Sequence, residues 1–350
     1  MIEKELTKPV NLCKANGNLN PEAVGWSRNP LHTCNLIGHW PRKKRWNYWA
    51  ITSAPYLFSV TVSNVDYSGL VFVYLADLTA GFFEETTHII PLGRGCDLPE
   101  TVDADLYYDA KGTRIDMIQT PNGVDLAVDG VDLAIDGVNL AIDVDDFAGQ
   151  ALSARFTISK PPGHETLNVV IPWNDRTFQF TSKQNTLPAD GMVAWGGEKR
   201  VFSGDQSFAC LDYGRGIWPR DCTWNWGSAS GRQNKRTIGL NLGGQWTDGT
   251  GYTENGICID GRLTKISETL HWDYDKRDFN KPWRITAPSH AVDLTFTPAM
   301  ERVAASDLWL VKSEVHQMFG YYDGTVRTVA GETIPIEKMF GWAEDHVATW

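Results

Sequence analysis

The sequence contains no apolar stretch long enough for a membrane-spanning helix, which needs about 20 consecutive apolar residues. Residues 1–12, MIEKELTKPVNL, lack the apolar centre and the small-residue cleavage site of a signal peptide. Basic residues are also scarce relative to acidic ones, and the formal net charge is −11. Such a chain repels phosphate backbones. We therefore expect a cytoplasmic protein with no membrane span and no nucleic-acid partner.

The cysteines form no pattern that is typical of metal or redox sites. The six cysteines are Cys13, Cys34, Cys96, Cys210, Cys222 and Cys258. None belongs to a CxxC pair, and none lies at a zinc-like spacing from a histidine. In a chain without a secretion signal, buried free thiols are the default expectation. We expect no metal site.

Common catalytic motifs are missing as well. The sequence has no GxSxG elbow, no HExxH and no dinucleotide fingerprint. The glycine-rich stretch 241–261 lacks the lysine and the following helix of a P-loop. These absences argue against common hydrolases, zinc peptidases and nicotinamide enzymes, and we expect no cofactor.

Tryptophan is the residue that is unusually abundant, with 15 in 350 residues. Its large ring and single donor suit cores, barrel interiors and ligand clefts. This composition favours a small-molecule ligand that is either apolar or sugar-like.

Most of the chain consists of short segments with β-branched and aromatic residues at every second position. The clearest are 57–65, 69–78, 113–120, 154–160, 166–173, 178–184, 290–298 and 308–324. Turn signals such as Pro121-Asn122-Gly123 separate them. We expect short helices only near 19–25 and 335–340. The pattern predicts an all-β protein with two antiparallel β-barrel or sandwich halves, because closure protects strand edges.

A Gly-, Pro- and Asp-rich stretch, residues 187–205, marks the expected boundary between the halves. We place an N-terminal domain at 1–195 and a C-terminal domain, which carries the Trp-rich segment, at 196–350.

The N-terminal half contains a seven-residue repeat over 123–143, read as GVDLAVD, GVDLAID and GVNLAID. Its alternation predicts a strand, but a step of seven reverses the faces between copies, and the glycines could absorb that reversal in a bulge. A calcium site is the alternative, although the spacing of calcium-binding β-rolls is missing. We expect a duplicated strand or hairpin and infer no function from it.

Residues 212–230, DYGRGIWPRDCTWNWGSAS, concentrate functional side chains. Aromatic plates beside carboxylates and guanidinium groups supply what a ligand pocket needs. The alternative is a bulky loop that closes one end of a barrel, with Arg215 paired to Asp212. From this segment we expect Asp221 to be catalytic. We expect the following to bind ligand: Tyr213, Arg215, Trp218, Trp224, Asn225 and Trp226.

Glu254 and Asn255 stand where a strand begins again after the glycine-rich turn. An inward Glu254 would lose solvation, which raises the pKa of its carboxyl and suits a general acid. The alternative is a strand-end residue that bonds the nearby backbone. We expect Glu254 to be catalytic, and Asn255 and Trp246 to bind ligand.

Further candidates lie at both ends of the chain. His316 and Gln317 are adjacent in a strand, so they face opposite sides. His316 is a candidate proton carrier, with a purely structural role as the alternative, and Gln317 is a candidate ligand-binding residue. Arg28 and His32, in the segment 25–40, are expected to line the cleft between the halves. Glu344, Asp345 and His346 follow near the C-terminus, where we expect a framing role.

Several segments together resemble a known family. They are GWSRNPLH, GHETLNVVIPW, DYGRGIWP, WNWGSASG, GYTEN, PW, HQMFG and GWAEDH. In this combination the chain resembles, over nearly its whole length, the bacterial family called domain of unknown function 2804. It is more distantly similar to the lipocalin-like superfamily of carotenoid 1,2-hydratases, AttH-like proteins and Diels–Alder cyclases. That resemblance implies two lipocalin-like barrels with a ligand site in or between them, and it transfers no catalytic residues.

Three functions stay open. The first is binding of a small apolar or terpenoid-like molecule in a Trp-lined cavity, with proton transfer for hydration, isomerisation or cyclisation. Glu254 or Asp221 would then protonate, and indole faces would stabilise a developing cation. The second is a carbohydrate-active hydrolase or lyase that uses Trp stacking and paired carboxylates. The third is a non-catalytic ligand-binding protein.

Overall fold

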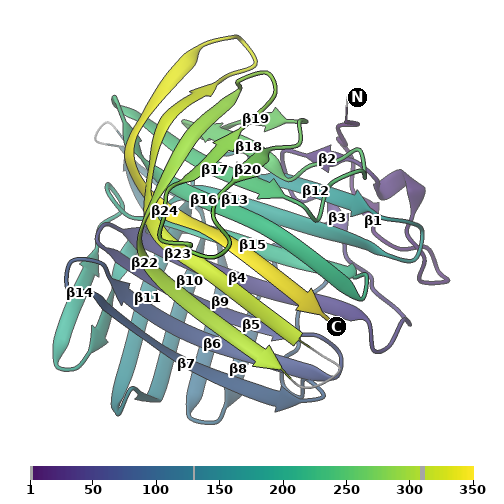
Figure 1. Cartoon of the computed structure of the whole chain (residues 1–350). Coiled ribbons are helices and arrows are strands. Elements are labelled where there is room, and N and C mark those ends of the chain that lie inside the picture. The colour runs from purple at the N-terminus through teal and green to yellow at the C-terminus, as the bar shows by residue number, and fades with distance from the viewer. Residues whose placement is uncertain (1–2, 129–130, 308–311) are drawn as a thin grey trace.

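The computed structural model describes residues 3–128, 131–307 and 312–350, and the fold is all-β (Figure 1). Strands account for 64% of the structure and helix for 1%. The helical residues described are one 3-10 turn, Pro21–Ala23, which lies inside the expected segment 19–25. The helix expected near 335–340 is wrong, because these residues belong to a strand. Ile334 and Ile336 are buried on one face of that strand, and so short an apolar run does not separate helix from strand.

The first sheet has 13 strands and takes in the N-terminal half. Its main path is β7 (Phe82–Pro91), β6 (Ser68–Asp77), β5 (Tyr56–Asn64), β4 (Lys43–Ser53), β15 (Phe208–Ile217), β13 (Phe178–Trp195), β11 (Gln150–Lys160), β10 (Val131–Phe147), β9 (Thr113–Val128) and β8 (Leu106–Ala110). Off this path lie β12 (Leu167–Pro172), β14 (Glu198–Phe202) and β2 (Trp26–Ser27). A separate parallel pair joins β1 (Val10–Asn11) to β3 (His32–Thr33).

The second sheet has nine strands from the C-terminal part of the chain. Its order is β19 (Arg262–Ile266), β18 (Asn255–Ile259), β17 (Arg236–Gly244), β16 (Asp221–Gln233), β24 (Thr333–Thr349), β23 (Lys312–Arg327), β22 (Val292–Asp307), β21 (Trp283–Thr286) and β20 (His271–Asp273). Neighbouring strands are antiparallel. The predicted fold class, two lipocalin-like antiparallel halves, is confirmed.

Each sheet curls around a core of its own, and the two sheets also pack on each other. One apolar cluster fills the first half and includes Phe58, Ile142 and Phe180. Another fills the second half and includes Trp283 and Phe296. A third cluster lies between the sheets, where β22, β23 and β24 cross over β4, β5 and β6 (Figure 1). A fourth joins β2 and β12 of the first sheet to β19 and Trp246 of the second half. A strand at this crossing therefore buries both of its faces.

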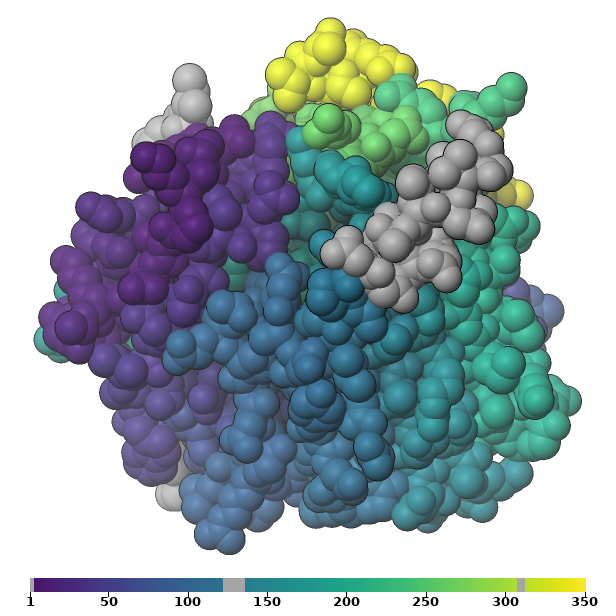
Figure 2. Space-filling model, turned by 180° about the vertical axis from the view of Figure 1, so that it is seen from behind, coloured from purple at the N-terminus to yellow at the C-terminus, as the bar shows by residue number. Residues whose placement is uncertain are grey.

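Seen from behind, the N-terminal segment covers one side of the first half (Figure 2). It reaches the second half through Glu3, whose carboxylate accepts from the backbone N–H of Thr253 at 3.0 Å and pairs with Lys265 Nζ at 2.8 Å. This buried ion pair fastens the start of the chain to the second sheet.

The seven-residue repeat forms a hairpin, as its alternation indicates. Its first copy lies in β9 and its later copies in β10, and the register between the two strands shifts between Ile135 and Gly137. The expected side-chain pattern over 122–135 and the turn at 129–130 lie outside the described residues. The shift falls at a repeat junction, where a bulge absorbs the odd step.

The two sheets change over later in the chain than the expected boundary at 195/196. Strands β14 and β15 continue the first sheet to Ile217, and the second sheet starts at Asp221. The division into domains 1–195 and 196–350 stays a prediction. No helix in the described ranges is long and apolar enough to cross a membrane.

Two glycines allow close contact between the backbone and large side chains within each half. A Cβ at Gly214 of β15 would collide with the indole of Trp46, and a Cβ at Gly243 of β17 would collide with the side chain of Glu254. Glycine at these two positions lets large side chains lie flat on the neighbouring strand.

Trp283 tests the core of the second half. It is fully buried and stacks on Tyr274 with ring centroids 4.1 Å apart. We expect Trp283→Ala to lower the free energy of unfolding by about 3–5 kcal/mol, because it removes a large buried ring and leaves a cavity. Tyr107→Ala, at a 55% exposed ring, should cost about 0.5 kcal/mol. Urea midpoints with unchanged slopes would measure both, and equal midpoints for the two variants would contradict the expectation.

Candidate functional site between the two sheets

The register of β4, β13 and β15 decides which side chains of the first sheet face the second. Asp212 lies opposite Tyr48 and Lys183, so these three side chains share one face. Tyr213 lies opposite Asn47 on the other face. Because cross-strand partners point the same way, Asp212 and Lys183 face the second sheet.

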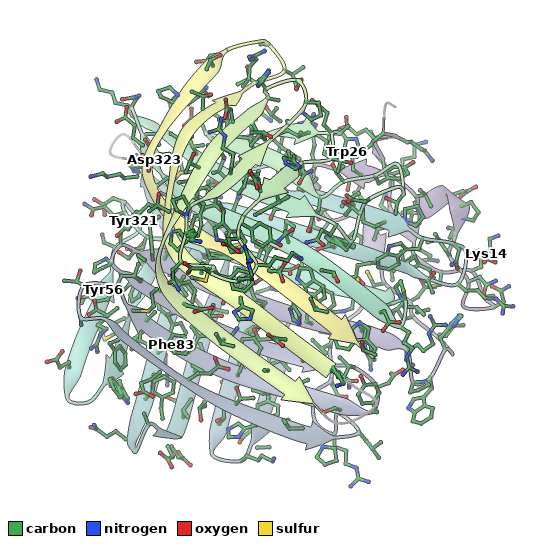
Figure 3. All side chains as sticks on the ribbon, in the orientation of Figure 1. Lys14, Trp26, Tyr56, Phe83, Tyr321 and Asp323 are labelled. Atoms are coloured by element: carbon green, nitrogen blue, oxygen red, sulfur yellow. The ribbon has the colours of Figure 1, made fainter. Side chains whose placement is uncertain are left out.

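The register of β16, β23 and β24 decides which side chains of the second sheet face the first. Trp226 lies opposite Glu344, which in turn lies opposite Gln317. These side chains face the first sheet, in a region crowded with aromatic rings such as Phe83 and Tyr321 (Figure 3). The site is therefore an interface between two sheets rather than the interior of either half.

Lys183 lies at the centre of this interface and joins the two halves. Its ammonium lies 2.9 Å from Asp212 Oδ2 and 3.3 Å from Glu254 Oε2. It also lies over the indole ring of Trp226, 3.9 Å from the ring centroid. Burial lowers the pKa of Lys183, but the two carboxylates outweigh burial and raise it above its ordinary value. Lys183 thus carries its charge at neutral pH.

Glu254 has an environment that favours its protonated form. Its side chain is 1% exposed, and Oε1 accepts a hydrogen bond of 2.7 Å from Trp246 Nε1. Burial raises the pKa of Glu254, and the charge of Lys183 opposes that shift without cancelling it. Asp212 adds to the rise because its negative charge is close.

Glu344 is the second buried carboxyl with a raised pKa. Oε1 accepts from Trp224 Nε1 at 3.0 Å, and Oε2 accepts from the amide of Gln317 at 3.2 Å. Among the described residues no cation lies within ion-pair distance of this carboxyl. Burial raises the pKa of Glu344 to about 7, against the opposing effects of the Trp224 N–H and the more distant Lys183 and Arg302. At neutral pH the group can both give and take a proton.

A hydrogen-bonded chain continues from Glu344 into the first sheet. The hydroxyl of Tyr74 donates to Gln317 Oε1 at 3.1 Å and lies 2.8 Å from the hydroxyl of Tyr48. Beside it, Arg302 makes two bonds to Glu85, of 2.7 and 3.1 Å, with its guanidinium over the ring of Tyr74. Polar groups from six strands of both sheets therefore bond to one another inside one interface.

Charge balance explains the two raised pKa values. Four carboxyls (Asp212, Glu254, Glu344 and Glu85) share the cations Lys183 and Arg302. Lys183 is closest to Asp212, and Arg302 is committed to Glu85. Glu254 therefore shares its cation with Asp212, and Glu344 has no cation at ion-pair distance among the described residues, so burial raises the pKa of both carboxyls.

A group of six indoles, which we call the tryptophan cluster, lies beside this network. Its members are Trp218 and the five indoles in ring contact with it, Trp46, Trp173, Trp224, Trp246 and Trp350. Trp218 stacks on Trp246 with ring centroids 5.6 Å apart and touches Trp224 edge-on at 5.4 Å. Both carboxyls with a raised pKa accept a hydrogen bond from an indole N–H of the cluster. Trp246 donates to Glu254, and Trp224 donates to Glu344.

The tryptophan cluster borders an open hollow of about 500 Å³ at the surface. The residues that line it are Trp173, Pro219, Asp221, Cys222, Thr223, Gln245, Trp246 and Asp248. A smaller hollow of about 230 Å³ lies elsewhere, around His164 and Arg232, and contains none of the network described above. The larger hollow, unlike the smaller one, is lined by members of the tryptophan cluster, Trp173 and Trp246.

The structure brings together part of the set expected from the sequence. Trp218, Trp224, Trp226, Trp246, Glu254 and Gln317 all lie in the interface. Asp221 lies at the rim of the hollow, where it is exposed and accepts from the hydroxyl of Thr349 at 2.9 Å.

Tyr213, Arg215 and His32 lie inside the first half instead. Arg215 is 1% exposed and donates to the carbonyl of Pro99 and to Asn47 Oδ1. The hydroxyl of Tyr213 donates to the same carbonyl, and the His32 ring packs on Phe180. The expected convergence of Tyr213 and Arg215 with Glu254 is thus not what the structure shows, because these residues point to the opposite face of β15.

His316, Asn225, Asn255 and Arg28 are also held away from the network. His316 lies between Glu301 and Glu314 on the other face of β23, and Asn225 donates to Tyr274 on the same side of the sheet. Asn255 accepts from the backbone N–H of Gly243.

Arg28 has two carboxylate partners, Glu5 and Glu165, and also donates to the carbonyl of Leu263. It therefore ties the N-terminal segment to both sheets, away from the hollow.

Several residues of the network were not among the catalytic or ligand-binding residues expected from the sequence: Lys183, Asp212, Arg302, Glu85, Tyr48 and Tyr74, and also Glu344, for which a framing role was expected. The signal for Glu344 in the sequence was its place two residues before His346. Its position opposite Trp226 of the WNWG segment is known only from the structure. Alternation alone could not separate it from Asp345, which faces the other way and accepts from Tyr274. In the described parts of the chain no three His, Cys, Asp or Glu side chains gather as metal ligands.

Fold and site together define a double half-barrel protein with an acid-bearing, tryptophan-rich interface. The chain belongs to the family described as Domain of unknown function (DUF2804), which matches residues 3–350. No protein with a curated description matches the sequence significantly.

Three solved structures are similar in fold. Kievitone hydratase from Nectria haematococca shares 8% identity over 91% of this chain and 94% of its own, with a TM-score of 0.49. A protein assigned as AttH from Nitrosomonas europaea shares 12% over 88% and 93%, with a TM-score of 0.45. CghA with Sch210972 shares 11% over 88% and 89%, with a TM-score of 0.44.

Glu344 makes stability depend on pH in an unusual direction. Its folded-state pKa, about 7, lies above the ordinary 4.5, so its contribution is complete at low pH and is lost as the pH rises through 7. Between pH 5 and pH 8 this loss amounts to about 2–3 kcal/mol. Glu344→Gln imitates the neutral form, so we expect it to be more stable than the natural chain at pH 8 by about that amount relative to pH 5. Urea unfolding at both values measures this, and Glu198→Gln, at an exposed carboxyl, serves as the control.

Proposed function

We propose that this protein binds a small, largely apolar, terpenoid-like molecule at the tryptophan cluster and catalyses a proton transfer on it. Hydration, isomerisation and cyclisation of an alkene all begin with such a step. The observation that carries the proposal is that two buried carboxyls with raised pKa are both held by indoles of the cluster that borders the hollow.

The chemistry follows from the two kinds of group. A carboxyl with a pKa near the working pH is an effective general acid and base. Protonation of an alkene leaves a carbocation, and indole faces attract positive charge. Glu344 or Glu254 would supply the proton, and Trp218, Trp224 and Trp246 would face the developing cation.

Access to the carboxyls requires movement of a ring. Trp246 is 7% exposed, and its N–H is turned inward to Glu254, so the indole separates the carboxyl from the hollow. We infer that an apolar ligand replaces part of the contact between Trp246 and Trp173 and lets the indole turn. Trp224 holds Glu344 in the same way, through its indole N–H, but it lies behind the residues that line the hollow rather than among them.

The alternatives differ in what they require of the carboxyls. Glycoside cleavage needs two carboxyls that flank a bound sugar, whereas Glu254 and Glu344 lie behind indoles and accept bonds from them. A protein that only binds its ligand has no use for two buried carboxyls whose pKa is raised by burial. Both alternatives remain outcomes of the following experiment.

Incubation in D₂O with geraniol and with geranylamine tests the proposal. We expect mass spectrometry to find product that has gained one deuterium or one D₂O. Glu344→Gln or Glu254→Gln should lower the rate about 10²–10⁴-fold, and Glu198→Gln should leave it unchanged. Tight binding with no deuterium in any product would make the protein a binder, and full rates in both Gln variants would remove the carboxyls from the mechanism.

Trp224→Phe gives a readout that mere destabilisation would not produce. The indole N–H of Trp224 is the strongest of the effects that hold down the pKa of Glu344, and phenylalanine keeps an aromatic plate without the donor. We expect the pH–rate profile of deuterium incorporation to move to higher pH in this variant. An unmoved profile would mean that Glu344 is not the group that titrates.

A further inference from the structure

The hollow offers an incoming molecule π faces and hydrogen-bond acceptors. Trp173 Nε1 donates to the carbonyl of Trp246 at 2.9 Å, and Trp246 Nε1 donates to Glu254. Both indole donors are therefore used inside the protein. What these two rings can present to the hollow is carbon and π surface.

The charged side chains of the lining are both acidic. Asp221 and Asp248 both line the hollow, and within the described ranges neither has a cation at ion-pair distance. Asp221 Oδ1 accepts a hydrogen bond from the Thr349 hydroxyl, so that Oδ2 remains for a ligand. Burial without a cation also raises the pKa of Asp248. The amide nitrogen of Gln245 donates a hydrogen bond to Asn225 Oδ1, at 2.6 Å.

The eight lining residues include no lysine, arginine or histidine. Arg42 and Lys44, which touch the tryptophan cluster, have other partners. Arg42 donates to the carbonyl of Trp218 at 2.8 Å. Lys44 Nζ lies between the rings of Tyr67 and Trp350, 4.6 Å from each centroid. Arg220 is exposed next to Asp221 in sequence but is not among the lining residues.

We propose that the hollow selects an organic cation, namely a protonated or quaternary amine carried on an apolar body. Indole faces and carboxylates both attract such a group, and a ligand ammonium would supply the charge that Asp221 and Asp248 lack. The inference rests on the function proposed above, because it names the substrate class for the same hollow. The acidic chain as a whole, with net charge −11, favours the approach of a cation.

Geraniol and geranylamine form a matched pair for the test, because they share one apolar body and differ in the hydroxyl or ammonium group. Titration at pH 7, followed by tryptophan fluorescence and by ligand NMR line broadening, gives both dissociation constants. We expect geranylamine to bind about five- to tenfold more tightly. The preference should shrink as salt screens the exposed carboxylates.

Variants locate the preference in the hollow. Asp221→Asn and Asp248→Asn should each reduce the preference for the amine about two- to threefold, and the double variant should bring it close to one. Trp173→Leu, which keeps apolar bulk and removes the π face, should also reduce it. Asp205→Asn, at an exposed carboxylate in the turn after β14 that does not line the hollow, is the control.

The outcomes separate this inference from the function on which it rests. Equal affinity for the two ligands, or a preference that survives in the double variant, overturns the cation inference. Deuterium incorporation into geraniol would then still support proton-transfer catalysis. Failure of both ligands to bind at millimolar concentration overturns the hollow as a ligand site. Tighter binding of geranylamine without deuterium incorporation keeps the cation inference and removes the catalytic one.

Discussion

The ammonium of Lys183 holds an electrostatic position on which the rest of the interface depends. It contacts a carboxylate from each side. These are Asp212, on β15 of the first sheet, and Glu254, which directly precedes β18 of the second. Loss of this one charge would leave two carboxyls buried together, which costs several kcal/mol. Because the ammonium also lies on the face of Trp226, the aromatic packing and the charge pairing fix each other. The relative placement of the two sheets is therefore tied to a polar contact as well as to apolar area.

The position of Lys183 also explains why two of the buried carboxyls have a raised pKa. One ammonium cannot neutralise every carboxyl around it, and Arg302 is held by Glu85. The fold thus buries Glu254 and Glu344 with a raised pKa, at the expense of stability. Proteins commonly tolerate such strained groups where chemistry occurs. The indole donors of Trp246 and Trp224 limit the cost, because they hydrogen-bond the carboxyls whether or not these are ionised.

The architecture was accessible from the sequence, because alternation at period two in segments such as 57–65 and 154–160 has no other good solution than a strand. The site was only partly accessible. Alternation shows that Asp212 and Tyr213 face opposite ways, and likewise Glu344 and Asp345, but it cannot show which face meets the other sheet when both are buried. Tyr213, with its larger aromatic ring, was the natural choice and lies inside the first half. Lys183 gave no signal of its own, since a lysine near a strand end usually points to solvent.

Gly214 constrains which residue can occupy position 46. Its missing side chain is the space that the Trp46 ring occupies. Addition of a methyl group at 214 without a smaller residue at 46 would drive the ring out of the interface, and a smaller residue at 46 alone would leave a void beside Trp218. Positions 46 and 214 are therefore coupled, because a change at either one alone produces a collision or a void.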